Sequence, residues 1–123
     1  MDPISTGGAP RAIGPYSQGA RAGSILATSG QIPIDPATGA MPDSIEDQAR
    51  LAISNALAVV AAGGEGWEIV SVRIFLADMA DFAAVNRVYE GMFAEPHPAR
   101  SCVAVSAIPK GAKIEVEALA VRA

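Results

Sequence analysis

The sequence contains few of the residues that mark metal, redox or nucleic-acid chemistry. It has one histidine and one cysteine, so it offers no zinc-binding cluster and no intrachain disulfide. Its nine Lys and Arg residues are scattered and the net charge is −4, and both features disfavour a nucleic-acid partner. No phosphate loop, nucleotide fingerprint or convincing Ser-His-Asp set occurs. We therefore expect any catalysis to proceed without a metal and without a cofactor.

Long apolar runs are also missing. The longest, residues 56–62, is far too short to cross a bilayer, and residues 1–14 lack the apolar core of a secretory signal. We expect no membrane partner and a cytoplasmic location, which the single cysteine also fits. Half of the residues are hydrophobic but only 5% are aromatic, so the apolar side chains are mostly small. This composition favours a single domain over residues 1–123 that associates with further copies of itself.

The first part of the chain is typical of a hairpin. Short runs at 17–22 and 24–29 flank Gly23, whose conformational freedom suits the turn. A second turn is predicted at 35–39, where proline and glycine fall in suitable places. Residues 1–14 are rich in glycine and proline and are expected to be loose.

Two helices and a strand follow in the predicted order. Apolar residues at helical spacing begin near Asp43 or Ser44, and Asp43 with Glu46 resembles a capping box. Gly63-Gly64 is expected to end this helix. Alternation predicts a strand at 67–76, and Asp81 is expected to cap a second helix.

The last part of the chain predicts two more strands, at 101–107 and 113–121, after prolines end the second helix. The order is then β-β-α-β-α-β-β. It indicates an α+β fold with one mixed sheet and two helices on one face. The other face of the sheet must meet water or a neighbouring copy.

Arg100 and Cys102 form the most informative pair. They are two residues apart in a predicted strand and therefore share a face. The planar guanidinium of an arginine can bind a carboxylate through two hydrogen bonds. From physical chemistry alone, an exposed Arg100 in a weak surface ion pair is the favoured interpretation. A lone cysteine is more often a small buried side chain than a nucleophile.

Further polar residues occupy places where a ligand could bind. Glu115 lies on a predicted strand and could orient a water, although Glu117 beside it fits an ordinary rim carboxylate. Tyr16, Ser29 and Gly30 in the first half of the chain also qualify, and Tyr16 and Gly30 each have a structural alternative. Tyr16 can anchor its loop, Gly30 can mark a bulge at a strand end, and Ser29 precedes Gly30. Asn86 on the second helix is a binding candidate whose alternative is a solvated or capping side chain.

Taken together and in order, these stretches resemble the Rid (YjgF-type) family of reactive-intermediate deaminases. The resemblance covers about 13–120, and each motif is weak alone. The matching segments are Ile13-Gly14-Pro15-Tyr16-Ser17-Gln18, Ser29-Gly30-Gln31-Ile32-Pro33, Asp35-Pro36 with Thr38-Gly39, Asp81-Phe82, Val85-Asn86, Tyr89, Pro98-Ala99-Arg100-Ser101-Cys102, Ile108-Pro109-Lys110-Gly111 and Ile114-Glu115-Val116-Glu117-Ala118.

The resemblance implies a chorismate-mutase-like domain that assembles as a homotrimer with sites between subunits. It implies hydrolysis of enamines and imines such as 2-aminoacrylate to 2-keto acids and ammonia, with no cofactor. Arg100 would bind the substrate carboxylate and Glu115 would orient the water, which makes these two the catalytic candidates. The substrate-binding candidates are Tyr16, Ser29, Gly30, Asn86, Arg100 and Cys102.

One departure from the family leaves alternatives open. The family commonly has a longer segment with an aromatic residue before Pro-Ala-Arg-Ser, whereas this chain has Glu95-Pro96-His97-Pro98. His97 is either part of the pocket wall or an ordinary loop residue. The alternatives for function are a specialised relative such as an aminomuconate-type deaminase, a non-enzymatic module that binds small keto acids, and RNA cleavage, which the acidic charge disfavours.

Overall fold

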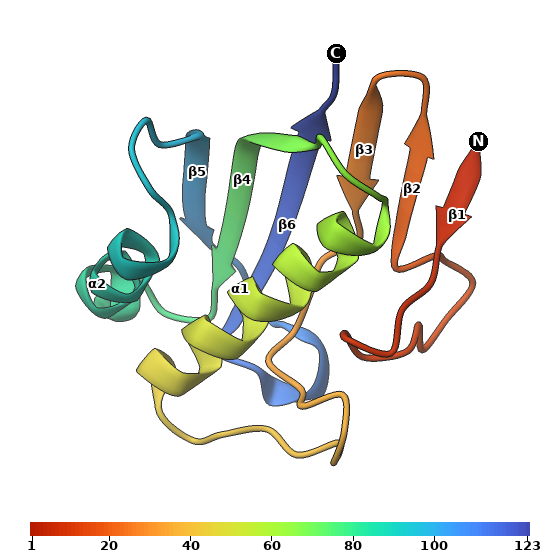
Figure 1. Cartoon of the computed structure of the whole chain (residues 1–123). Coiled ribbons are helices and arrows are strands. Elements are labelled where there is room, and N and C mark those ends of the chain that lie inside the picture. Colours follow the sequence, from red (N-terminus) through yellow and green to blue (C-terminus); the bar gives the residue numbers. More distant parts are fainter.

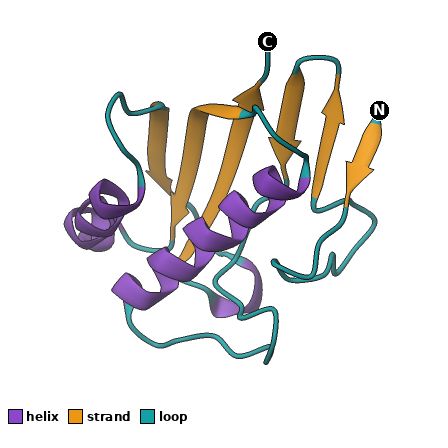
Figure 2. Ribbon diagram, in the orientation of Figure 1, coloured by secondary structure: helices purple, strands orange, loops and turns teal.

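A single sheet carries two helices on one face (Figures 1 and 2). The computed structural model describes all residues, 1–123. The strands are β1 (Asp2–Ile4), β2 (Gly19–Ala22), β3 (Ile25–Thr28), β4 (Glu68–Leu76), β5 (Ala99–Ala104) and β6 (Ile114–Val121). The helices are α1 (Ile45–Ala62) and α2 (Phe82–Met92), with 3-10 turns at Met79–Asp81 and Pro109–Gly111. The spatial order of the strands is β1-β2-β3-β6-β4-β5.

The sheet is mixed, as the sequence predicts. Strands β4 and β5 are parallel and α2 connects them, whereas all other neighbours are antiparallel. One strand was missed, because residues 1–14 were expected to be loose and β1 in fact pairs with β2. This strand has three residues and contains Pro3, so it is too short to show alternation. Proline is tolerated there because β1 lies at the edge of the sheet.

Helix α1 begins one residue later than the predicted capping box. Ser44 is the N-cap, and its side chain accepts a hydrogen bond from the backbone nitrogen of Asp47 at 3.1 Å. The prediction that Asp43 caps with Glu46 is therefore wrong, because Ser44 supplies the same acceptor one position on. The predicted end is confirmed: the helix stops before Gly63, and Gly64 has a φ of 104°.

Helix α2 begins without the side-chain cap that the sequence predicts. Asp81 makes no capping hydrogen bond, whereas Asp78 accepts one from the backbone nitrogen of Ala80 at 2.9 Å. The 3-10 turn before α2 accounts for the difference, because it moves the first free backbone donors three residues upstream.

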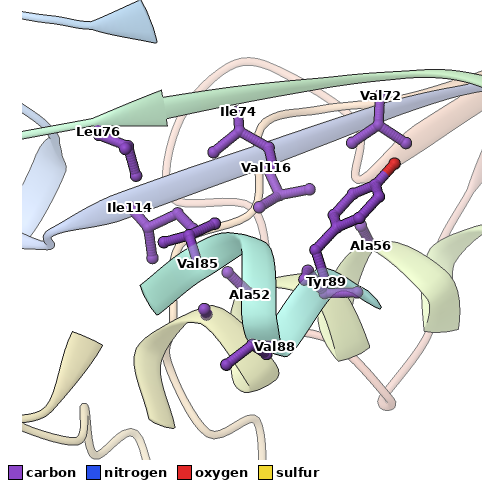
Figure 3. Close-up of a cluster of buried hydrophobic side chains, with 12 residues drawn as sticks. Ala52, Ala56, Val72, Ile74, Leu76, Val85, Val88, Tyr89, Ile114 and Val116 are labelled. Atoms are coloured by element: carbon purple, nitrogen blue, oxygen red, sulfur yellow. The ribbon is translucent and has the colours of Figure 1, made fainter. Parts of the chain in front are cut away.

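The main core lies between the sheet and the helices (Figure 3). Alternation on the two central strands supplies its sheet side, from Val72, Ile74 and Leu76 on β4 and from Ile114 and Val116 on β6. The helices supply Ala49, Ala52, Ile53, Ala56, Val85, Val88 and Tyr89. The opposite face of the sheet is open and carries exposed apolar side chains, namely Ile25, Val103, Leu119 and Val121.

Two buried side-chain amides hold the loop segments 6–10 and 32–34 in place. Gln18 is 5% exposed, and its side chain bonds to the backbone of Thr6, Ala9 and Pro10. Asn55 on α1 is 1% exposed. It donates hydrogen bonds to the carbonyls of Ile32 and Ile34 at 3.1 and 3.0 Å. Buried amides satisfied in this way fix irregular backbone that no ladder stabilises.

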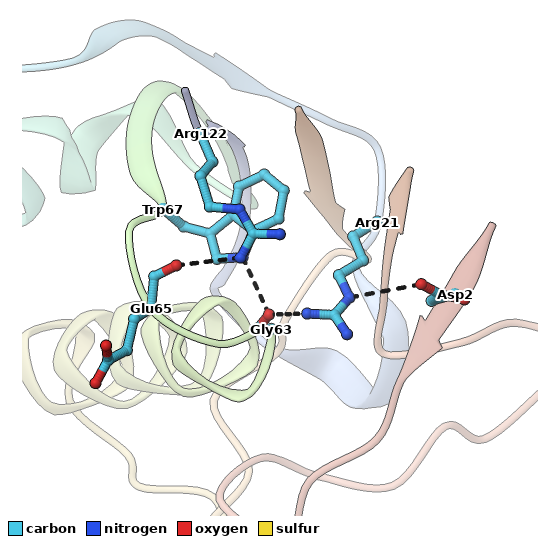
Figure 4. A network of polar contacts seen from close by, with 6 residues as sticks. All are labelled: Asp2, Arg21, Gly63, Glu65, Trp67 and Arg122. Carbon is cyan, nitrogen blue, oxygen red and sulfur yellow. Dashed lines mark hydrogen bonds and ion pairs between the residues drawn. The ribbon is translucent and has the colours of Figure 1, made fainter. Parts of the chain in front are cut away.

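Residues on or next to three strands of the sheet surround the C-terminal end of α1 (Figure 4). The Gly63 carbonyl accepts hydrogen bonds from Arg21 on β2 and from the indole nitrogen of Trp67, the latter at 3.1 Å. The guanidinium of Arg122 covers the Trp67 ring at 4.3 Å from its centroid. The helix is thereby fixed against strands β2, β4 and β6. Neither helix has the length and apolar character needed to cross a membrane.

Candidate functional site

Arg100 occupies the helix-covered side of β5, at the edge of the sheet beside α2. Its Nη2 donates a hydrogen bond to Asn86 Oδ1 at 2.7 Å. Its Cζ lies over the ring of Tyr89 at 4.7 Å from the centroid. No carboxylate lies within ion-pair distance, since the ion pairs of the chain involve other arginines. The surface ion pair considered as an alternative is therefore wrong, and a half-buried guanidinium retains free donors.

A hollow of about 300 Å³ opens over this guanidinium. Its walls come from α2 and from the loop before β5, and the lining residues are Asn86, Tyr89, Glu90, His97, Pro98 and Arg100. His97 is thus part of the pocket wall, the first of its two predicted positions. Asn86 holds Arg100, so the solvated or capping alternative for Asn86 is wrong.

Cys102 shares the face of Arg100, as the strand alternation predicts. It pairs in register with Ile74 and packs against the core. Burial raises the pKa of the Cys102 thiol, and the positive charge of Arg100 opposes that rise without cancelling it. The thiol is therefore protonated at neutral pH, and a nucleophilic role is disfavoured.

Glu115 projects from the opposite, open face of the sheet and lies against Gly30. A Cβ atom on Gly30 would come within 2.5 Å of Glu115 Oε2, so only glycine leaves room for the carboxylate. The segment is held there by Gln31, whose backbone exchanges two hydrogen bonds with Val116 at 2.7 and 3.0 Å. Burial, with a smaller contribution from the Glu117 carboxylate, raises the pKa of Glu115.

Tyr16 and Ser29 lie close to Gly30. The Ser29 hydroxyl donates to the Ser17 carbonyl at 2.5 Å, which ties the Tyr16 loop to the end of β3. Tyr16 is 46% exposed, and its hydroxyl accepts a hydrogen bond from the backbone of Ile13 at 3.2 Å. Tyr16 and Gly30 line one small hollow together with Arg11. The exposed ring of Tyr16 is thus available to a ligand, whereas Ser29 acts on the backbone.

The predicted site residues therefore form two groups that do not meet within one chain. The arginine cluster consists of Asn86, Tyr89, Arg100 and Cys102. The glutamate cluster consists of Tyr16, Ser29, Gly30 and Glu115. The register pairs Arg100 with Val72 and Cys102 with Ile74, both on the helix-covered face, while Glu115 pairs with Phe75 on the open face. A small molecule that contacts both clusters must bind between two copies of the chain.

Sequence reasoning gave Asn86 as a binding candidate but missed Tyr89 and Glu90 beside Arg100. Asn86, Tyr89 and Glu90 follow helical spacing and so face the same side of α2. That spacing could have indicated a shared wall, but Tyr89 also fits the apolar stripe of α2, and its ring does lie in the core. Arg11 was missed for a different reason, because it lies in a segment without regular structure and no periodicity indicates its direction.

A half-buried arginine with free donors, at the edge of an α+β sheet, is an arrangement that can bind the anionic group of a small molecule. The chain matches the family Endoribonuclease L-PSP over residues 6–122. The chain belongs to that family. The proteins that it is similar to include a YjgF gene product and a reactive intermediate deaminase.

The chain is similar to a 2-iminobutanoate/2-iminopropanoate deaminase from Salmonella typhimurium, with 51% identity over 97% of this chain and 96% of that protein. The crystal structure of Escherichia coli TdcF with bound serine matches with a TM-score of 0.95 and 46% identity, covering all of both chains. The crystal structure of the YjgF gene product from E. coli matches equally well, with a TM-score of 0.95 and 47% identity over both full chains. These similarities confirm the predicted family and fold.

Proposed function

We propose that the protein hydrolyses short 2-imino acids and their enamine tautomers, such as 2-aminoacrylate, to 2-keto acids and ammonia. The observation that carries the proposal is Arg100, a fixed guanidinium with free donors and no carboxylate partner. Such a group suits the carboxylate that every 2-imino acid carries. The names of the relatives, 2-iminobutanoate/2-iminopropanoate deaminase and putative reactive intermediate deaminase TdcF, support the same reaction.

The active site forms between two subunits of a homotrimer in this proposal. One subunit contributes the arginine cluster and its neighbour contributes the glutamate cluster. The positions of Arg100 and Glu115 on opposite faces of the sheet support this arrangement. The exposed apolar side chains on the open face support it as well, since a second copy would cover them.

The reaction follows from these two groups. Arg100 binds the substrate carboxylate and so holds the imine carbon in place. Glu115 accepts a proton from a water molecule as the water oxygen bonds to that carbon, while the second bond of the C=N group breaks and the imine nitrogen takes a proton from solvent. The tetrahedral carbinolamine then collapses: its hydroxyl proton passes to solvent, the C=O bond forms, the carbon–nitrogen bond breaks, and the nitrogen takes the proton that Glu115 returns and departs as ammonia. A carboxyl with a raised pKa suits this exchange, because the rise makes the carboxylate a stronger proton acceptor and its acid form can return the proton.

The reaction requires only water and proton transfer, so no cofactor is included in the proposal. In this proposal the Tyr16 ring covers the substrate beside Gly30, and Cys102 contributes a neutral thiol. The crystal structure of TdcF with bound serine supports a ligand of this size, since serine, like a 2-imino acid, carries its carboxylate and its nitrogen on the same carbon.

The first test generates 2-aminoacrylate with a serine dehydratase and follows the appearance of pyruvate. The protein should accelerate pyruvate formation, and its Arg100→Ala variant should not. If neither protein accelerates the reaction while both are folded, the proposed activity is wrong and a keto-acid-binding module becomes the better description. Direct titration with 2-oxobutanoate then decides whether binding remains.

A second test asks whether the site lies between subunits. Arg100→Ala and Glu115→Gln variants are unfolded together and refolded as a mixture. If each site takes one cluster from each of two subunits, random assembly of equal amounts restores about a quarter of the wild-type activity. A mixture that stays inactive, with mixed oligomers demonstrated by mass spectrometry, contradicts a site between subunits. The control mixes wild type with the double variant, in which intact sites persist in both arrangements.

RNA cleavage is the competing function that the family description suggests. The net charge of −4 and the scattered basic residues disfavour it, because RNA binding depends on clustered cations. An aminomuconate-type substrate is favoured by one observation only, the replacement of a bulkier aromatic residue by His97 in the wall of the arginine hollow.

A further inference from the structure

Arg100 rests on a stack of two aromatic rings. Tyr89 and Phe93 stack with their centroids 4.4 Å apart and an interplanar angle of 25°. The Cζ of Arg100 lies over the same Tyr89 ring at 4.7 Å. Two groups this close to one ring centroid cannot occupy the same face, so Tyr89 is held between Phe93 and the guanidinium. Phe82 adds a third ring, 5.7 Å from Arg100 Cζ.

The Tyr89 hydroxyl takes no part in this stack. Tyr89 is 6% exposed, and its Oη is buried without a hydrogen-bond partner. Figure 3 shows the hydroxyl directed toward β4 near Val72, which is the register partner of Arg100. An unsatisfied buried hydroxyl destabilises a fold, so the hydroxyl and the ring of Tyr89 are expected to have opposite effects.

We propose that Tyr89 is a positioning residue for the proposed reaction, with its ring as the platform that holds the Arg100 guanidinium toward the substrate carboxylate. Asn86 fixes one end of the guanidinium at 2.7 Å, and the ring fixes its distance from α2. Phe93 in turn fixes the ring, and Phe93 immediately precedes the loop that carries His97. The orientation of Arg100 is thereby coupled to that shortened loop.

The inference rests on the proposed function, because it assumes that Arg100 binds a carboxylate. The test therefore measures binding of 2-oxobutanoate, the keto-acid product, to the oligomeric protein by calorimetry. Tyr89→Leu removes the platform and should raise the Kd about 2- to 30-fold, the range of a cation–π contact. Tyr89→Phe keeps the platform and should leave the Kd unchanged while raising the midpoint of thermal unfolding, because it removes the unsatisfied hydroxyl.

Two controls separate positioning from a general loss of structure. In an Arg100→Lys background the Tyr89→Leu change should alter the Kd much less, because an ammonium does not stack on a ring as a guanidinium does. NMR of the arginine side chains should show an Arg100 resonance shifted upfield by the ring, present in wild type and Tyr89→Phe and absent in Tyr89→Leu. If Tyr89→Leu does not fold, Phe93→Leu serves instead and should raise the Kd in the same direction.

The outcomes distinguish this inference from the proposed function. If wild type binds no 2-oxobutanoate, the assignment of Arg100 as a carboxylate site fails. If wild type binds and folded Tyr89→Leu binds equally well, only the platform is wrong. An equal effect of Tyr89→Leu in the wild-type and Arg100→Lys backgrounds also overturns the platform, because the ring would then act without Arg100.

Discussion

Replacing Gly30 with alanine tests the placement of Glu115 by the smallest possible change. The new methyl carbon would lie 2.5 Å from Oε2, 2.6 Å from Cδ and 3.0 Å from Cγ of Glu115. Ordinary contact begins at 3.4 Å, so the carboxylate must move by about 1 Å. The side chain can rotate to do so, and the backbone of Gly30 has no positive φ that would strain an alanine.

The expected effect is therefore large on catalysis and small on stability. Displacing a catalytic group by about 1 Å can lower a rate about 100-fold. We expect kcat for 2-aminoacrylate hydrolysis to fall by about 10- to 100-fold, because the carboxylate no longer meets the water that it orients. The free energy of unfolding should change by less than about 1 kcal/mol, since the clash involves the far end of a flexible side chain.

The assay measures kcat by pyruvate appearance and stability by urea unfolding. Gly91→Ala is the matched control, because an added Cβ on Gly91 meets nothing within 4 Å. It should leave kcat unchanged and stabilise α2 by up to about 1 kcal/mol. In a Glu115→Gln background, Gly30→Ala should cost little further activity. A folded Gly30→Ala protein with wild-type kcat would refute the role assigned to the Glu115 carboxylate.

Four further predictions follow from the structure. Glu115 must be ionised to accept a proton, so activity should rise with pH through the raised pKa of Glu115. Glu117→Gln should move this acidic limb to lower pH, because the Glu117 carboxylate contributes to the raised pKa of Glu115, and pH–rate profiles of the two proteins check the direction. Cys102→Ser should retain most of the activity that Arg100→Ala loses, since the thiol is neutral; a reversed order in kcat/KM would contradict the mechanism. Asn55→Ala should lower the free energy of unfolding by about 2 to 4 kcal/mol, because two carbonyls lose their buried donor; urea unfolding measures it, and a loss below about 1 kcal/mol would contradict this role for Asn55. His97→Phe should change the relative kcat/KM for substrates with short and long side chains, since His97 lines the arginine hollow, and identical ratios in both proteins would remove His97 from the pocket.

Much of the sheet could be predicted because its strands have one buried face. Alternation on β4 and β6 separated Val72, Ile74 and Leu76 from the residues of the open face, and the structure confirms this division. It could not predict β1, which has three residues and takes its place from pairing with β2. Nor could the sequence pattern predict which side chain caps each helix, because nearby aspartate and serine side chains all offer an oxygen that can accept the hydrogen bond.

The candidate site was predictable residue by residue but not as an arrangement. Arg100 and Cys102 share a face, as their spacing requires. The separation of Arg100 from Glu115 depends on the order of β5, β4 and β6 in the sheet, and a single sequence carries no signal for that order. The contact of Asn86 with Arg100 depends on how α2 packs over the edge strand, which is likewise a tertiary property.

The contact between the Arg122 guanidinium and the Trp67 ring gives this protein an intrinsic fluorescence probe at one position. Trp67 is the only tryptophan in the chain, so all indole fluorescence arises at the junction of α1, β4 and the C-terminus. Arg122 directly follows β6, the strand that also carries Glu115. Emission from Trp67 therefore reports whether the C-terminal end of β6 is in place, and it does so without any added label.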